Sequence, residues 1–415
     1  MRKLTILVLL MMSASGCRSG ETEANRVTQR DSAGIVIVEN PSQMALDAGG
    51  WGIEKEPFLS IGSVDGDEDT SLFRVERGHR LADGGIAIVN GGAHEIRVFD
   101  GSGSLVSTFG REGDGPEEFR DIRLAGVVGR DTLVLVDVSR KRLALIHPEE
   151  GFLQGAPVAD EVSSFPVPSG TFADGRVVFA VSGRIEWSED FVEGPARPLQ
   201  EYRTSDLQGA FTGSLGSKPG SEVVLSTMIY NGEPMVRRAS GPLGKFPRSA
   251  VSSDRFYFGS EDTFEIEAVD PEGRIRRLIR VMEDPHPVTA EAYALFVEEE
   301  IGSRYLDEDA ERRVREVYRE REETLPPTFP AHGLLETDAL DHLWVEEYRL
   351  PGQETLVWSV FDPQGIRLAR VSLPRPMVIM EIGQDYLMGL VRDDLDVEYV
   401  QLFRLYRGEA QTVDR

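Results

Sequence analysis

Six short apolar segments recur along this chain, most of them directly after a turn signal such as Asp or Asp-Gly. Each segment is a brief run of β-branched, aromatic and leucine side chains, which is typical of a buried strand. At one equivalent position per segment, three of the five intervals are 44–47 residues and the others are 79 and 87. This repeat constrains the fold more than any other feature. The segments are residues 85–90, 132–137, 176–181, 255–260, 342–347 and 386–391.

A second pair of strands, joined by a tight turn, follows several of these segments. Two of the turns have the sequence Asp-x-x-Gly, at residues 270–273 and 362–365. The Asp side chain accepts hydrogen bonds at the start of such a turn, and Gly tolerates a positive φ at its end. Units of about 40–50 residues with four strands each are the signature of propeller blades. We therefore expect an all-β fold, a six-bladed β-propeller over residues 31–410.

The two long intervals contain additional sequence. Residues 289–323 carry apolar side chains at helical spacing among Glu, Arg and Ala, and Pro326 and Pro327 end the pattern. This predicts a helical insertion between blades four and five. The 79-residue interval has Gly- and Pro-containing stretches around residues 183–199 and 227–242, which we interpret as long loops or extended hairpins.

The two ends of the repeat predict how the ring closes. The last unit ends after residues 400–406, one strand short of a blade. Near the N-terminus, residues 58–62 resemble the closing strand of the first blade at residues 106–110. We expect the N-terminal strand to complete the last blade, which removes exposed sheet edges. Residues 35–38 predict a further strand nearby.

The N-terminus has the layout of an export signal. Arg2 and Lys3 precede an apolar stretch at residues 4–12, and small residues then lead to Cys17, the single cysteine. The segment resembles a bacterial lipoprotein lipobox, although Ala14 stands where Leu is usual. The resemblance implies a signal peptide at residues 1–16, a diacylglyceryl group on Cys17 and outer-membrane sorting. The alternative is an ordinary signal peptide with a cysteine nearby by chance. Residues 17–30 are polar and predict a flexible tether.

Charge excludes one class of partner. The chain has 71 acidic and 45 basic residues, a formal net charge of −26. Such a surface repels nucleic acid and anionic lipid headgroups, so we expect no nucleic-acid partner. After the N-terminal segment, no apolar stretch approaches the roughly 20 residues that a spanning helix needs. We expect a monomer that contacts the membrane only through its lipid anchor.

Two further stretches carry a family resemblance. Residues 110–119 (GREGDGPEEF) resemble the inter-blade loop of NHL-repeat propellers, and residues 31–40 (DSAGIVIVEN) add to the match. The chain is thus similar to the six-bladed β-propeller lipoproteins of bacterial envelopes, over roughly residues 31–407. The resemblance implies the fold and a place in the cell envelope, but no activity, because propellers host many unrelated functions.

Metal and catalytic motifs are scarce. The chain has no GxSxG, P-loop, HExxH or dinucleotide fingerprint, and its six histidines show no metal-ligand spacing. Asp65, Asp67, Asp69 and Glu76 fall at positions 1, 3, 5 and 12 of a calcium loop, with Thr70 where that loop requires Gly. We hold a solvated acidic loop as the principal interpretation and calcium binding as the alternative. We expect no other cofactor.

Two function classes remain open. One is a non-catalytic binding or scaffold module for an envelope protein, small molecule or glycan. The other is a divalent-metal-dependent hydrolase or lyase of the gluconolactonase-like kind. Ligand sites in propellers usually lie where inter-blade loops meet at one end of the central channel. We therefore take as candidate ligand-binding residues those that lie in the predicted inter-blade loops. The candidate ligand-binding residues are Arg74, Arg111, Asp114, Arg120 and His332.

Overall fold

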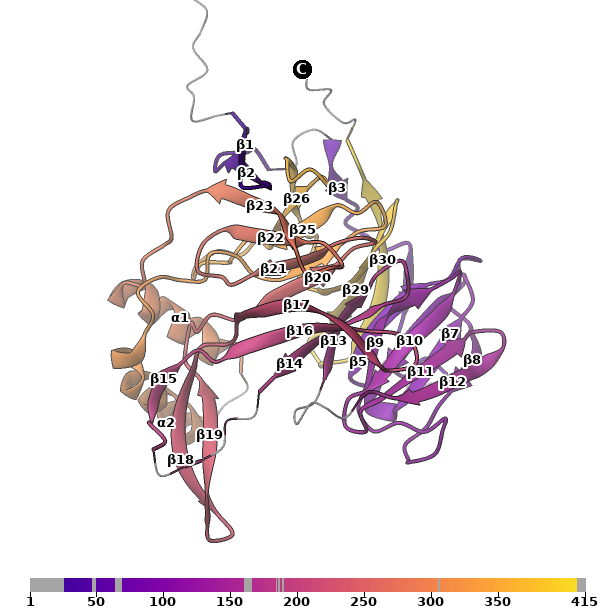
Figure 1. Ribbon diagram of the computed structural model, residues 1–415, viewed down its shortest axis with the longest axis horizontal. Helices are drawn as coiled ribbons and strands as arrows, with labels where there is room; N and C mark the ends of the chain where they lie inside the picture. The colour runs from indigo at the N-terminus through magenta and orange to yellow at the C-terminus, as the bar shows by residue number, and fades with distance from the viewer. Residues whose placement is uncertain are drawn as a thin grey trace, which may run out of the picture.

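The computed structural model describes residues 26–46, 50–63, 69–159, 166–183, 185, 187–188, 190–304 and 307–408. The signal peptide, Cys17 and most of the expected tether lie outside these residues. Within them, the chain forms antiparallel sheets of consecutive strands (Figure 1). Three of these sheets come from the first half of the chain. Their strands are β5 (Val75–Arg80), β6 (Ile86–Asn90), β7 (Glu95–Phe99) and β8 (Leu105–Phe109); β9 (Ile122–Val128), β10 (Thr132–Asp137), β11 (Arg142–His147) and β12 (Gly151–Pro157); and β13 (Val167–Thr171), β14 (Val177–Ser182), β16 (Leu199–Ser205) and β17 (Phe211–Pro219).

Three further sheets come from the second half. In each, successive strands pair with their neighbours in chain order. Their strands are β20 (Arg248–Val251), β21 (Phe256–Gly259), β22 (Glu265–Val269) and β23 (Ile275–Met282); β24 (Leu335–Thr337), β25 (Leu343–Glu346), β26 (Val357–Phe361) and β27 (Arg367–Ser372); and β28 (Val378–Ile382), β29 (Tyr386–Arg392) and β30 (Glu398–Tyr406).

The first strand of each sheet faces a common centre, which gives the arrangement of a β-propeller. β5, β9, β13, β20, β24 and β28 all contribute residues to one central cavity. The second strand of each sheet is buried, as in β6, where every residue is buried. Neighbouring sheets pack over these second strands, which is why the sequence shows them as apolar runs. All six segments that the repeat predicts are these second strands: β6, β10, β14, β21, β25 and β29.

The N-terminal part of the chain completes the last sheet. β3 (Gly52–Ile53) and β4 (Leu59–Ile61) both pair antiparallel with β30, and β4 places Ile61 opposite Val400. Ile61 is 1% exposed and packs in the core between the last sheet and the β5–β8 sheet. The prediction that an N-terminal strand completes the last unit is confirmed.

The segment before it behaves differently from expectation. β1 (Thr28–Ser32) and β2 (Ile35–Pro41) form a hairpin, and β2 pairs in parallel with β23 on the outside of the fourth sheet. The predicted strand at residues 35–38 is confirmed as part of β2, but it pairs with β23 and not with the closing strand β4 or its sheet. Asn40 explains the placement, because its buried amide donates to the carbonyl oxygens of Arg280 and Gly365 and accepts from the Arg367 amide. These bonds hold β2 between two sheets.

Two helices follow β23 in the chain. They are α1 (Ala290–Gly302) and α2 (Glu308–Glu320), and a short 3-10 turn, η4 (Glu322–Thr324), comes after them. Thr289 and Asp307 cap the helices by accepting from the Ala292 and Ala310 amides, as N-cap residues do. Tyr293 packs with Phe329 and Leu243, so the helix pair is fixed to the propeller by an apolar cluster.

A three-stranded sheet stands beside the helices (Figure 1). It consists of β15 (Gly194–Ala196), β18 (Val223–Tyr230) and β19 (Glu233–Ser240). The chain also has a 3-10 turn, η3 (Gly91–Ala93), between β6 and β7. Among the described residues, no helix is both long enough and apolar enough to cross a bilayer.

A buried carboxylate ties the C-terminus to the fifth sheet. Asp338 is buried and accepts from His342 Nδ1 at 3.0 Å, Trp344 Nε1 at 2.9 Å and Arg407 Nη1 at 2.6 Å. Trp51 packs edge-on against His342 and Trp344, and Arg407 lies over its ring. Burial alone would raise the pKa of Asp338, but these hydrogen bonds and charges outweigh it and lower the pKa to about 2.

We predict an acid-labile contribution from Asp338. Because its pKa is lower in the folded protein than in the unfolded chain, the stabilisation is fully present above about pH 4 and is lost as the pH falls toward 2. The loss amounts to about 2.5 kcal/mol. Urea unfolding of the wild type and of Asp338→Asn across this pH range measures it. If the free energy of unfolding of Asp338→Asn fell between pH 4 and pH 2 as steeply as that of the wild type, the assignment would be contradicted.

Candidate functional site

The six innermost strands enclose a cavity of about 700 Å³ along the centre of the propeller. Each of the six sheets of the ring contributes to its wall, so the shape of the cavity depends on the whole ring. The wall carries both polar and apolar side chains, and its charged groups distinguish it from the apolar second strands behind it. Its ionisable and hydroxyl-bearing residues include Glu76, Arg77, His79, Thr171, Arg248, Glu336, Thr337 and Glu381.

Side chains in the wall tie each inner strand to the backbone of a neighbour. Glu76 accepts from the Leu124 amide at 2.9 Å, which joins β5 to β9. Thr171 donates to the Ala125 carbonyl at 3.1 Å, and Thr337 donates to the Val251 carbonyl at 2.8 Å. These bonds satisfy the backbone at the cavity wall and hold the inner strands in register.

One ion pair joins inner strands that are not neighbours in the ring. Arg77 Nη2 on β5 lies 2.7 Å from Glu336 Oε1 on β24, although β28 comes between these strands in the order of the sheets. Both side chains keep some exposure, at 32% and 21%. The charge of Glu336 raises the pKa of Arg77. A fixed guanidinium and carboxylate therefore stand together in the cavity, where a ligand can hydrogen-bond to either.

A second polar group lies where β5 meets β28. His79 Nδ1 is 2.9 Å from Glu381 Oε2, and the same carboxylate accepts from the Arg80 amide and from the Tyr386 hydroxyl. Burial lowers the pKa of His79, but the hydrogen bond and charge of Glu381 outweigh it and the net pKa is raised. Burial and the Glu381 charge raise the pKa of Tyr386, which stays a donor. His79 Nε2 makes no hydrogen bond to any described residue.

Glu76 is the cavity carboxylate with no direct ion pair among the described residues. Burial raises its pKa, although the bond from Leu124 and the charges of nearby Arg77 and Arg123 act to lower it. An acid with a raised pKa in a cleft is a candidate for ligand contact. The cavity thus offers an acceptor or donor at Glu76, a donor at Arg77 and an imidazole at His79.

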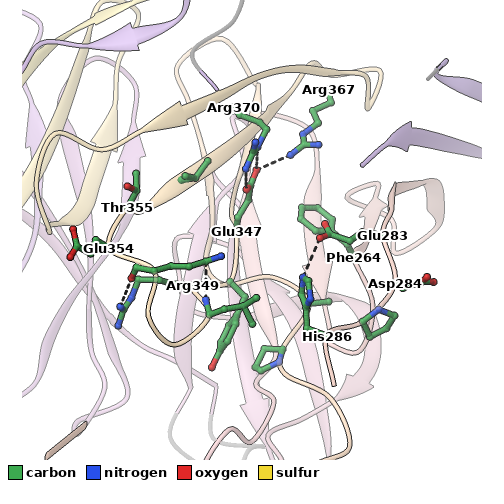
Figure 2. Close-up of a pocket in the computed structure, with 17 residues that line it drawn as sticks. Phe264, Glu283, Asp284, His286, Glu347, Arg349, Glu354, Thr355, Arg367 and Arg370 are labelled. Carbon is green, nitrogen blue, oxygen red and sulfur yellow. Dashed lines mark hydrogen bonds and ion pairs between the residues drawn. The ribbon is translucent and has the colours of Figure 1, made fainter. Parts of the chain in front are cut away.

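A smaller pocket of about 480 Å³ lies between the fourth and fifth sheets (Figure 2). Glu347 lies in it and binds Arg370 through both oxygens, at 2.8 and 2.6 Å, and Arg367 at 2.7 Å. Burial would raise the pKa of Glu347, but Arg370, Ser359 and Arg367 lower it overall. Arg367 also donates to the carbonyl oxygens that follow β2. This pocket is built around bonds that hold β2 in place, so the central cavity is the stronger candidate.

The predicted ligand residues lie elsewhere. Arg111, Asp114 and Arg120 belong to one loop, in which Asp114 accepts from Arg120 at 2.6 Å and Glu118 accepts from Arg111 at 2.9 Å. Arg74 has a φ of 51° and places its guanidinium over the Phe73 ring. None of these residues lines the central cavity, and their ligand role stays a prediction.

His332 does not line the central cavity either, and its ligand role stays a prediction. Its side chain is fully buried, its Nδ1 lies 2.9 Å from the Gly333 carbonyl oxygen, and its ring packs against Phe264. Burial lowers its pKa to about 4, so the ring is neutral at pH 7.

The calcium loop is only partly described. Asp65 and Asp67 lie outside the described residues, and the Asp69 carbonyl accepts from Arg97. Glu76 lines the cavity instead, and no group of three His, Cys, Asp or Glu among the described residues could hold a metal ion. The calcium alternative stays a prediction.

Sequence reasoning missed the residues that give the cavity its chemistry. Arg77, His79, Glu336 and Glu381 lie on inner strands, and only Glu76 had been singled out, as part of a calcium loop. The sequence did contain a signal. The segment VERGHR of β5 carries charged side chains, and a turn separates it from the apolar segment of β6.

Comparisons with known proteins do not assign the chain to a family. No family model matches it, and no curated protein matches it. Among solved structures, it is similar to a protein of Bacteroides fragilis described as exported (13% identity, 90% of this chain and 99% of that chain, TM-score 0.48). It is also similar to a DUF4221 family member of Bacteroides vulgatus (9%, 85% and 98%, 0.48) and to virginiamycin B lyase of Staphylococcus aureus (12%, 84% and 98%, 0.38). The fold described above rests on the strand pairing of this chain.

Proposed function

We propose that this protein is a lipid-anchored, six-bladed propeller of the bacterial envelope that binds a small polar ligand or glycan in its central cavity without catalysing a reaction. The helix pair is then an insertion between blades four and five, on a domain spanning residues 31–410. One observation carries the binding function: a cavity of about 700 Å³, lined by charged groups among apolar ones, to which all six inner strands contribute. Cavities of this size are typical of small-molecule sites.

The chemistry of the wall defines the kind of ligand. Glu76, the Arg77–Glu336 pair and the His79–Glu381 pair present acceptors and donors close together. A ligand with several hydroxyl, amide or charged groups satisfies such a wall, whereas an apolar ligand would leave its polar groups unpaired. The resemblance to a lipobox at Cys17 supports the anchor and the envelope location.

We predict that Cys17 attaches the chain to the membrane. Cys17→Ser should abolish labelling by a radioactive fatty acid and release the protein from the membrane fraction, because no other cysteine is present. In a diderm host, the wild type should fractionate with the outer membrane. Unchanged membrane association and labelling of Cys17→Ser would contradict the anchor.

We predict that blocking the cavity abolishes ligand binding. Ser169 lines the cavity on β13, and Ser217 is exposed on β17, the outer strand of the same sheet. Thermal unfolding is measured with a panel of monosaccharides, N-acetylated amino sugars and amino acids. A ligand at about 100 times its Kd stabilises the folded protein by about 2.7 kcal/mol. Ser169→Phe should lose this stabilisation, and Ser217→Phe should retain it.

Two results would overturn the proposal. Equal stabilisation of both variants would place binding outside the cavity. Turnover of a lactone, phosphoester or glycan, abolished by a chelator and restored by a divalent cation, would favour the metal-dependent hydrolase or lyase instead.

A further inference from the structure

The β18–β19 hairpin projects from the body of the propeller beside the helix pair (Figure 1). Its turn consists of Asn231 and Gly232, whose φ values of 50° and 85° match the two-residue turns that favour Asn-Gly. At its base, β18 pairs with β15, but beyond Leu225 the described structure pairs β18 only with β19. The outer half of the hairpin is thus a free two-stranded ribbon.

The tip of this ribbon carries exposed apolar side chains on both faces, and one charged residue, Glu233, lies opposite Tyr230 beside the turn. Met228 pairs with Met235, and Tyr230 lies on the same face because side chains alternate along a strand. Ile229 lies on the other face, where it pairs with Pro234. The exposed fractions of Met228, Ile229, Tyr230 and Met235 are 40%, 67%, 58% and 41%. None of them belongs to a core cluster of the described residues.

The exposure of apolar side chains on both faces of the ribbon limits the kind of partner that can bury them. A protein surface that docks on a sheet normally covers one face, and the other face stays polar. A two-stranded ribbon with apolar side chains on both faces buries them all only in surroundings that enclose it. The interfacial layer of a bilayer does this, and it also accommodates Tyr, whose ring is apolar and whose hydroxyl stays hydrated.

Two arginines lie behind the tip. Arg237 pairs with Ser226 and Arg238 with Leu225, so their side chains leave opposite faces of the ribbon. They lie three to four residues, or about 10 Å, from the Ile229–Pro234 pair. Both side chains are exposed, and neither forms an ion pair with a described residue, although Arg238 donates to the Gly183 carbonyl.

This spacing matches the depth of a membrane interface. Amphipathic segments bury their apolar parts by about 5–10 Å, and basic side chains behind them reach the phosphate groups. Val192 extends the apolar surface. It is 79% exposed, and the adjacent Glu193 carboxylate accepts from the Thr227 amide.

We propose that the β18–β19 tip inserts into the interfacial layer of a phospholipid bilayer, with Arg237 and Arg238 at the level of the phosphates. The contact is independent of any lipid on Cys17 and of the ligand in the central cavity. Because the whole chain is acidic, burial of the apolar tip supplies most of the binding, and the two arginines add a local attraction.

A position-specific fluorescent probe tests this. In the full chain with Cys17→Ser, Ile229→Cys creates a single cysteine for an environment-sensitive NBD label. On adding phosphatidylcholine vesicles containing phosphatidylglycerol, the label should shift to the blue and be quenched by spin-labelled lipid. Val106→Cys is the matched control, because Val106 is 65% exposed on a different sheet. Its label should not respond.

Variants separate the apolar and basic contributions. The triple substitution Met228→Ser, Ile229→Ser, Tyr230→Ser should lower vesicle binding at least tenfold and leave Tm unchanged, because these side chains pack in no core. Arg237→Gln with Arg238→Gln should weaken binding to vesicles with phosphatidylglycerol about fivefold per arginine. It should not affect phosphatidylcholine alone. The proposal would be overturned if the emission of the label at position 229 did not change with either type of vesicle. It would also be overturned if the emission shifted to the blue without lipid because the protein self-associates.

Discussion

The pairing of β4 with β30 is the interaction on which the rest of the structure depends. It brings residues 59–61 beside residues 400–402, from opposite ends of the chain, and so completes the last sheet. Ile61 then fills the core between this sheet and the β5–β8 sheet. Without this pairing, β30 would have an open edge and the ring would lack the contact that fixes β28 beside β5.

The central cavity follows from the closed ring. The His79–Glu381 pair spans the junction between the first and last sheets, and the Arg77–Glu336 pair reaches one sheet farther. The charged residues of the inner strands and the apolar character of the second strands therefore have one cause. The second strands are covered by neighbouring sheets, whereas the inner strands face a space open to water and ligand.

The parts of the fold that sequence could predict are those with a local signal. The apolar runs, the Asp-x-x-Gly turns and the helical pattern at residues 289–323 each depend on nearby residues, and the structure has strands or helices at these places. The parallel placement of β2 on β23 could not be predicted, because it depends on the contacts of Asn40 with residues 240 and more positions away. The same holds for the cavity. Glu336 and Arg77 are 259 residues apart in the sequence, and neither segment alone indicates that the two side chains form an ion pair. The burial of His332 could not be predicted either, because loop position in the sequence does not tell whether a side chain points inward.

A disulfide across the closing strands tests ring closure most directly. Ser60 and Gln401 are register partners on β4 and β30, so their Cα atoms lie within the range that a disulfide bridges. In the Cys17→Ser chain, Ser60→Cys with Gln401→Cys should oxidise spontaneously, become resistant to alkylation and gain about 2–4 kcal/mol of stability. Each single variant should keep a free thiol. A double variant whose two thiols stay free under oxidising conditions in the folded protein would contradict the closure on which this account rests.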